Sequence, residues 1–271
     1  MSNIFSLSVS EIAEKIRNSD LNSVDLCKSY IEQINKFEKD VKAWAHFDKK
    51  LLLEKAEEAD EHRRSGKSVG PLHGIPVALK DIIGTYDMPT ECGTVFRKKM
   101  SSSQDSEIVN LLKTAGAIIM GKTVTCELAY IHPSKTKNPH DYTRTPGGSS
   151  SGSAAVIASH MAHLSIGSQT GGSIIRPASY CGVVGYKPSY GLISRNGVLK
   201  TSEKLDTMGV FGKTVKDVAL LAKTLIKKDL YDPATVHFAA DDMMKVCEEG
   251  PVFDPKFIFY KTNNWKNIDK E

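Results

Sequence analysis

The sequence predicts an α/β protein that begins with helices, and three of its features support this fold class. From Ser8 to about Ser65, apolar residues recur every three to four positions, the period of amphipathic helices. From Gly70 onward, short β-rich runs alternate with a helical stretch. Residues 145 to 185 are dense in Gly, Ser and Thr, but apolar runs interrupt them. We therefore expect a folded loop region there rather than a flexible linker.

The length and composition are those of an ordinary globular protein. The chain has 271 residues, of which 40% are hydrophobic and 25% are charged, which is enough to bury a substantial core. We expect a single domain over residues 1–271. Its N-terminal helices span about 1–65, its core spans about 66–225, and about 226–271 form an incomplete C-terminal part.

The N-terminal part predicts two or three helices, with Ser8 or Ser10 as the first N-cap. The apolar residues that set the helical period are Ile12, Ile16, Leu26, Tyr30, Ile31 and Ile34. In the core, IPVALK (75–80) and AIIMGK (117–122) predict strands, and EIVNLLKTAG (107–116) predicts a helix between them. Further on, a helix is expected over 215–228.

The end of the chain predicts a strand, FIFYKT at 257–262, and then the start of a helix with Asn267 or Asp269 as its cap. The sequence stops before that helix develops. We therefore expect the chain to be a truncated form of a longer protein.

Charge and cysteine content restrict the function. The net charge of +4 is spread along the sequence without a long basic run, so a nucleic-acid partner is not expected. The cysteines are odd in number, widely spaced and without a Cys-x-x-Cys pair, which favours neither a disulfide framework nor a zinc site; they are Cys27, Cys92, Cys126, Cys181 and Cys247. No signal peptide or apolar run of about 18 residues is present, so we expect a cytoplasmic protein without a membrane partner.

Two short motifs match known patterns but are interpreted as decoys. GAIIMGKT (116–123) fits the phosphate-loop pattern, yet Ala-Ile-Ile-Met indicates a strand rather than a flexible cradle for phosphates. GSSSG (148–152) fits the nucleophile-elbow pattern, but the turn sequence DYTRTPG precedes it where an elbow needs a strand. The histidines available as bases for such an elbow are His160, His163 and His237.

Three other segments carry the chemistry together: GIPVALKD (74–81), PGGSSSGSAA (146–155) and SQTGGSIIRPASYCGVVGYKPSYG (168–191). A serine hydroxyl needs a base to become a nucleophile, and a lysine serves as that base when burial keeps it neutral. Lys80 ends an apolar strand, so we expect its amine at the rim of the core. The two glycines before Ser173 allow successive N–H groups to point at one spot beside its hydroxyl, as in an oxyanion hole.

These three segments resemble the amidase signature family, from the N-terminal helices to about Leu221. The resemblance implies a mixed central sheet flanked by helices and cleavage of a carboxamide C–N bond through an acyl-enzyme. It implies Ser173 as nucleophile, Ser149 as proton bridge in a cis peptide linkage, and Lys80 as base. The family's oxyanion hole corresponds to the amides of Thr170, Gly171, Gly172 and Ser173. Such a reaction needs no metal or organic cofactor.

Two positions depart from the common family pattern. Gln169 stands where many members have Asp, and Ile175 followed by Arg176 stands where they have Arg. This combination resembles the malonamidase-like branch, in which the arginine grips a substrate carboxylate, a role that suits a guanidinium. We therefore expect Arg176, Gln169 and Ser150 to bind a small amide bearing an acid group. A structural ion pair of Arg176 is the alternative.

The leading functional hypothesis is a small-molecule amidase, with a homodimer left open. An alternative within the family is the A subunit of the glutamine-dependent aminoacyl-tRNA amidotransferase, which hydrolyses glutamine and passes ammonia to a partner. A further alternative is an inactive fragment or a binding module that retains the fold, because family members are longer and their later region lines much of the pocket.

Overall fold

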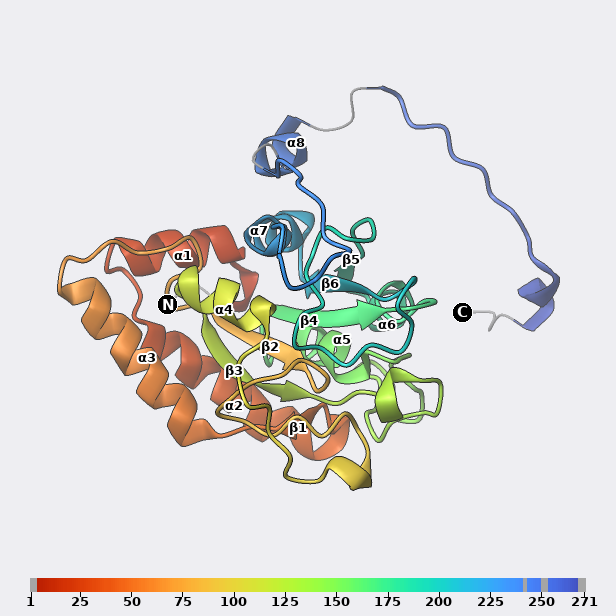
Figure 1. Cartoon of the computed structure of the whole chain (residues 1–271), viewed down its shortest axis with the longest axis horizontal. Coiled ribbons are helices and arrows are strands. Elements are labelled where there is room, and N and C mark those ends of the chain that lie inside the picture. The colour runs from red at the N-terminus through yellow and green to blue at the C-terminus, as the bar shows by residue number, and fades with distance from the viewer. Residues whose placement is uncertain (1–3, 241–242, 250–252, 268–271) are drawn as a thin grey trace.

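Six strands form one mixed sheet in the order β1-β3-β2-β4-β6-β5 in the computed structural model, which describes residues 4–240, 243–249 and 253–267 (Figure 1). The strands are β1 (Trp44–His46), β2 (Pro76–Lys80), β3 (Ile118–Thr123), β4 (Leu164–Gln169), β5 (Val184–Tyr186) and β6 (Thr207–Gly212). β2 pairs in parallel with both β3 and β4, whereas the other neighbouring strands pair antiparallel. The predicted α/β fold with a mixed sheet is confirmed.

The helices flank this sheet, and α1 to α3 gather on one side of the molecule (Figure 1). They are α1 (Val9–Arg17), α2 (Ser23–Val41), α3 (Lys49–Arg64), α4 (Glu107–Thr114), α5 (Ser151–Ala158), α6 (Ile175–Cys181), α7 (Val215–Leu225) and α8 (Met243–Glu249). Ser8, rather than Ser10, caps α1, because its hydroxyl accepts a hydrogen bond from the Glu11 amide while the Glu11 carboxylate accepts one from the Ser8 amide. Among the described helices, none is both long and apolar enough to cross a membrane.

The loop region expected over residues 145–185 contains two strands, β4 and β5, that the composition did not predict. All six residues of β4 are buried, because β2 and β6 pair with its two edges and helices cover the sheet. A strand buried on both faces shows no alternation of polar and apolar residues. Its serines also form hydrogen bonds inside the protein, as when the Ser165 hydroxyl donates to the Ser153 carbonyl at 2.7 Å.

The first turn of α5 lies directly against the backbone of the sheet. A Cβ atom at Gly152 would stand 2.3 Å from the Ala43 carbonyl oxygen and 2.5 Å from the Val124 nitrogen, so only glycine fits. The rest of α5 is apolar, and Val156 has no exposed surface. This contact fixes the chain segment that leads into α5.

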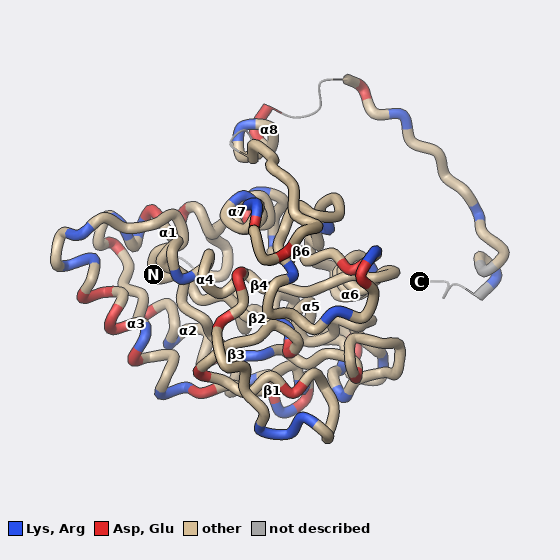
Figure 2. Tube along the Cα trace, viewed as in Figure 1, with Lys and Arg blue, Asp and Glu red and all other residues tan. Residues whose placement is uncertain are grey.

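Charged residues of both signs are interspersed along the trace, with α3 as the clearest case (Figure 2). On that helix Lys50 pairs with Glu54 at 3.6 Å and Lys55 pairs with Glu58 at 2.8 Å. Such exposed pairs stabilise a helix by about 0.3–0.5 kcal/mol each.

The strand expected at FIFYKT is wrong for this structure. Residues 257–262 are extended but pair with no strand among the described residues, and Phe257 to Tyr260 are 74–93% exposed. They follow α8 along a segment that runs away from the body of the protein (Figure 1). A strand needs the backbone of a neighbour to satisfy its hydrogen bonds. The helix expected next is a 3₁₀ turn over Asn263–Asn267, and Asp269 lies outside the described residues.

Candidate active site

The candidate site lies where β2 and β4 end. These two strands are parallel neighbours, with Leu79 opposite Ile166, so their carboxyl ends meet at one edge of the sheet. Open α/β sheets bind ligands at that edge. Lys80 ends β2, Gln169 ends β4, and the segment before α5 brings Ser149 to the same place.

Lys80 is fully buried, deeper than the rim position that we expected. Its Nζ donates a hydrogen bond to Ser149 Oγ at 2.7 Å and another to Ser168 Oγ at 2.8 Å. Burial lowers the pKa of Lys80 to about 7, against smaller opposing effects of Cys126 and Asp206. A substantial fraction of the amine is therefore neutral at neutral pH, as a base requires.

Ser149, the predicted proton bridge, lies beside Lys80 at the end of β2. The Gly148–Ser149 peptide bond is cis, as the family resemblance implied. The Ser149 hydroxyl accepts a hydrogen bond from Lys80, and its carbonyl oxygen accepts one from the Cys126 amide at 3.0 Å. The hydrogen bond from the Cys126 amide thus fixes the backbone at Ser149.

Ser168 is a member of this network that the sequence analysis missed. Besides Lys80, its backbone contacts Ser150: the Ser150 hydroxyl donates to the Ser168 carbonyl at 3.1 Å and accepts from the Ser168 amide at 3.3 Å. The Ser150 side chain, expected to bind substrate, is fully buried and bonded to β4. The signal for Ser168 was a polar residue two positions before the Thr-Gly-Gly-Ser run.

Ser173 lies in the turn between β4 and α6 and is 8% exposed. It lines a cavity of about 340 Å³. The cavity-lining residues are Ala129, Tyr130, Ile131, Thr170, Gly171, Gly172, Ser173, Arg176, Thr201 and Ser202. Among the described residues, the Ser173 hydroxyl has no hydrogen-bond partner. The hydrogen bond between Ser173 and Ser149 that the proton relay needs is therefore not formed in this structure. Catalytic hydrogen bonds commonly tighten only when substrate binds.

The backbone amides around Ser173 divide into two groups. Gln169 Oε1 accepts hydrogen bonds from the Ile174 amide at 2.8 Å and from the Ile175 amide at 3.0 Å. The amides of residues 171–173 donate to no described residue and remain available. The Gln169 side chain, expected to bind substrate, thus has its oxygen occupied by the first amides of α6.

The two glycines act differently from our expectation. Neither Gly171 nor Gly172 has a φ in the left-handed range, so the expected use of their special backbone freedom is wrong. A Cβ atom at Gly171 would meet nothing within 4 Å, and one at Gly172 would meet only the Arg176 Cβ at 3.8 Å. The absence of side chains instead leaves the cavity beside Ser173 open.

Asp206 fixes the position of Thr170 and was not predicted. Its carboxylate accepts hydrogen bonds from the Thr170 hydroxyl, from the Thr201 amide at 2.6 Å and from the Ser202 amide at 2.9 Å. Burial raises the pKa of Asp206, but these hydrogen bonds outweigh it and the net pKa is lowered. The ionised carboxylate therefore ties the 201–206 loop to the end of β4.

Arg176 reaches back to the segment that carries Ser149. Its Nη2 donates to the Gly148 carbonyl oxygen at 2.7 Å, and its Nε donates to the same oxygen at 3.2 Å. The residue lies at the surface and lines the cavity with Ser173. Two of its five N–H donors are thus used inside the protein.

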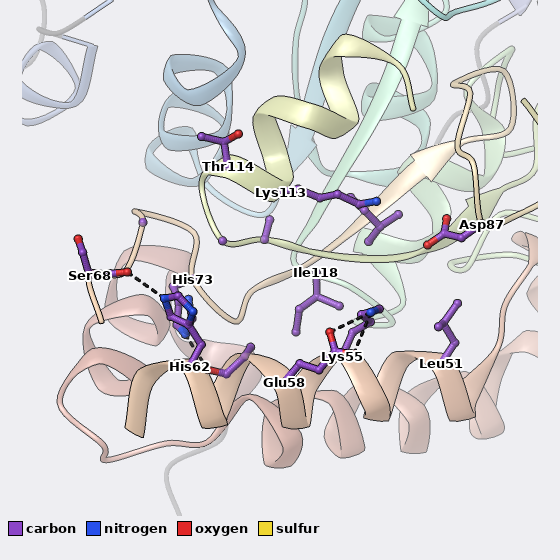
Figure 3. A pocket seen from close by; sticks show the side chains of 15 residues that line it. Leu51, Lys55, Glu58, His62, Ser68, His73, Asp87, Lys113, Thr114 and Ile118 are labelled. Atoms are coloured by element: carbon purple, nitrogen blue, oxygen red, sulfur yellow. Dashed lines mark hydrogen bonds and ion pairs between the residues drawn. The ribbon is translucent and has the colours of Figure 1, made fainter. Parts of the chain in front are cut away.

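Another cavity, of about 530 Å³, lies between α3 and the segment around Ile118 (Figure 3). None of the predicted site residues lines it. Several of its polar groups have partners within the protein: Lys55 pairs with Glu58, His62 contacts the Ser68 carbonyl, and His73 contacts the Ala59 carbonyl. The predicted nucleophile Ser173 thus lies at the smaller cavity and not at this one.

Comparisons with known proteins show the family of the chain. The amidase family model matches residues 25–258. A glutamyl-tRNA(Gln) amidotransferase A subunit of Clostridium acetobutylicum is 40% identical over 84% of this chain and 49% of that protein. The corresponding A subunit of Carboxydothermus hydrogenoformans is 37% identical over 91% and 52%. The peptide amidase of Stenotrophomonas maltophilia superposes with a TM-score of 0.81 and 31% identity, over 88% of this chain and 52% of that one.

The buried Lys80 with its hydrogen bond to Ser149 and the open turn around Ser173 thus lie at the same edge of the sheet. With the family match over most of its length, the chain belongs to the amidase family. It spans about half the length of the curated relatives that it matches.

Proposed function

We propose that this chain carries the reaction centre of an amide hydrolase. Neutral Lys80 accepts, through Ser149, the proton of the Ser173 hydroxyl as Ser173 Oγ attacks the amide carbonyl carbon. The same proton returns through Ser149 to the departing nitrogen when the C–N bond breaks. Water then hydrolyses the acyl-enzyme, restoring Ser173 and releasing the acid.

One observation carries this proposal most strongly: a fully buried lysine, its pKa lowered to about 7, donates a hydrogen bond to a serine at the edge where the Ser173 turn lies. The free amides of residues 171–173, together with that of Thr170, would bind the developing oxyanion. Losing one such donor costs about 2.7–4 kcal/mol in a hydrolase.

The substrate is a separate question, and the relatives favour one of the two candidates. The curated relatives matched at 36–40% identity carry the name of the A subunit of an amidotransferase. This supports the A subunit of a glutamine-dependent aminoacyl-tRNA amidotransferase, which releases ammonia from glutamine for a partner protein, over a free-standing small-molecule amidase. The second candidate keeps the support of Arg176, whose remaining N–H donors could bind an acidic group at the cavity.

The reaction centre is tested with a serine-reactive fluorophosphonate. We expect one adduct per chain, on Ser173 when mapped by mass spectrometry, and no adduct in Ser173→Ala. An unlabelled native chain, or labelling of another serine, would show that the reaction centre is not assembled and would favour the inactive fragment or binding module.

Glutaminase measurements separate the two substrate candidates. Ammonia release from glutamine is measured for the chain alone and with the partner subunits of an amidotransferase. Release that depends on those subunits supports the amidotransferase candidate. Turnover of small amides by the chain alone, with no response to the subunits, supports the free-standing amidase.

A further inference from the structure

Arg176 links the two chain segments that carry the reacting serines. Its backbone amide donates to the Gly172 carbonyl at 2.9 Å, inside the turn that holds Ser173. Its guanidinium donates twice to the Gly148 carbonyl, directly before Ser149. One residue therefore touches both the nucleophile turn and the relay segment.

We propose that Arg176 is a positioning residue that holds Ser149 in place between Lys80 and Ser173. This inference rests on the proposed function of the site. It assigns to Arg176 a task inside the reaction centre, whichever amide is the substrate.

The other contacts of the 147–149 segment do not involve the Gly148 carbonyl. The Ser149 carbonyl accepts from the Cys126 amide at 3.0 Å, and the Gly147 amide donates to Thr145 Oγ1 at 3.1 Å. A Cβ atom at Gly148 would lie 2.6 Å from Cys126 Sγ, so this side of the segment is tightly packed. On the other side, Arg176 is the partner of the Gly148 carbonyl. Without it, the peptide before Ser149 would lose the hydrogen bonds that set its orientation.

The geometry also bears on the alternative that Arg176 binds a substrate carboxylate. A bidentate grip uses two parallel N–H donors from one edge of the guanidinium. The edge formed by Nε and Nη2 already faces the Gly148 carbonyl. A carboxylate would have to bind at the remaining edge. The positioning role predicts that removal of Arg176 affects neutral and acidic substrates alike, whereas a carboxylate held at the remaining edge would make acidic substrates more sensitive.

The test compares Arg176→Ala and Arg176→Lys with the native chain, using one neutral fluorophosphonate and one bearing a carboxylate. For each probe, the maximal labelling rate and the half-saturating probe concentration are measured, together with the final stoichiometry. We expect Arg176→Ala to label about ten- to a hundredfold more slowly at saturation, as for loss of a charged hydrogen bond. The half-saturating concentration and the final stoichiometry should stay unchanged with both probes.

Two further variants sharpen the comparison. Arg176→Lys should recover part of the rate, because an ammonium can donate to the same carbonyl. Lys204→Ala removes an exposed positive charge from a residue that does not line the cavity, and should leave the rate unchanged. A fall in final stoichiometry in Arg176→Ala and Arg176→Lys alike would instead indicate a purely structural role and overturn the inference.

The remaining outcomes are also decisive. An Arg176→Ala chain that labels at the native rate overturns the inference while the proposed function stands. A raised half-saturating concentration for the acidic probe alone makes Arg176 a carboxylate ligand and also overturns it. If the native chain does not label at Ser173, the proposed function fails and the inference falls with it.

Discussion

Replacing Lys80 with methionine is expected to slow fluorophosphonate labelling of Ser173 by about 10²–10⁴-fold, the range that general acid–base catalysis contributes. Methionine fills much of the same buried volume but has no amine to accept the Ser173 proton. The Ser149 hydroxyl would lose its hydrogen bond from Nζ, and so would Ser168. The measurement is the labelling rate at Ser173 under conditions in which the variant remains folded.

Lys122 offers a matched control for this substitution. It too is fully buried, it lies opposite Leu79 on the neighbouring strand β3, and burial lowers its pKa to about 8. Its Nζ donates to the Ile83 carbonyl at 2.6 Å and to Thr90 Oγ1 at 2.7 Å, not to the candidate site. Lys122→Met should lose stability yet label normally while folded. Equal labelling losses in both variants would mean that any buried lysine is needed for the fold, and that Lys80 is not the base.

Replacing Ser149 with alanine is expected to produce a loss of similar size, about 10²–10⁴-fold, because the proton path from Ser173 to Lys80 is broken. Lys80 would keep its hydrogen bond to Ser168, so its amine stays anchored while the bridge is absent. The rate is measured with the same probe, and circular dichroism monitors folding.

Ser151→Ala is the control within the same serine run. The Ser151 hydroxyl makes only long contacts, 3.5 Å to the Ser149 carbonyl and 3.8 Å to Cys126 Sγ, and it does not touch Lys80. Its loss should change the rate little. If Ser149→Ala labelled as fast as Ser151→Ala, Lys80 would have to act on Ser173 without a serine bridge.

Local patterns predicted the parts of the fold whose signals lie within a few residues. Local patterns of this kind predicted the helices α1 to α3, the strands β2 and β3, and the helices α4 and α7. β4 was not predicted, because its Ser- and Gly-containing sequence is a strand only through burial between β2 and β6. FIFYKT shows the opposite case, a sequence with high β propensity that finds no partner strand among the described residues.

The residues of the candidate site also fall into two groups: some lie within local sequence motifs, and others are placed only by contacts with distant parts of the chain. Lys80, Ser149 and Ser173 lie within motifs whose order along the chain is specific. Ser168 and Asp206 have no such motif, and their roles depend on contacts across many residues: Lys80 meets Ser168 across 88 positions, and Thr170 meets Asp206 across 36. Ser150 lies in a motif too, but the contact of its hydroxyl with the backbone of β4 could not be predicted from that motif.

If neutral Lys80 takes the Ser173 proton through Ser149, as proposed, the reactivity of Ser173 follows the protonation state of the lysine. The most direct test is the pH dependence of the Ser173 labelling rate in the native chain. Because burial lowers the pKa of Lys80 to about 7, the amine is protonated below that pH and neutral above it. The rate should therefore rise about tenfold per pH unit below pH 7 and level off above it, with the same midpoint in Lys122→Met. A midpoint near the ordinary lysine pKa of about 10.4, or a rate independent of pH, would contradict the claim.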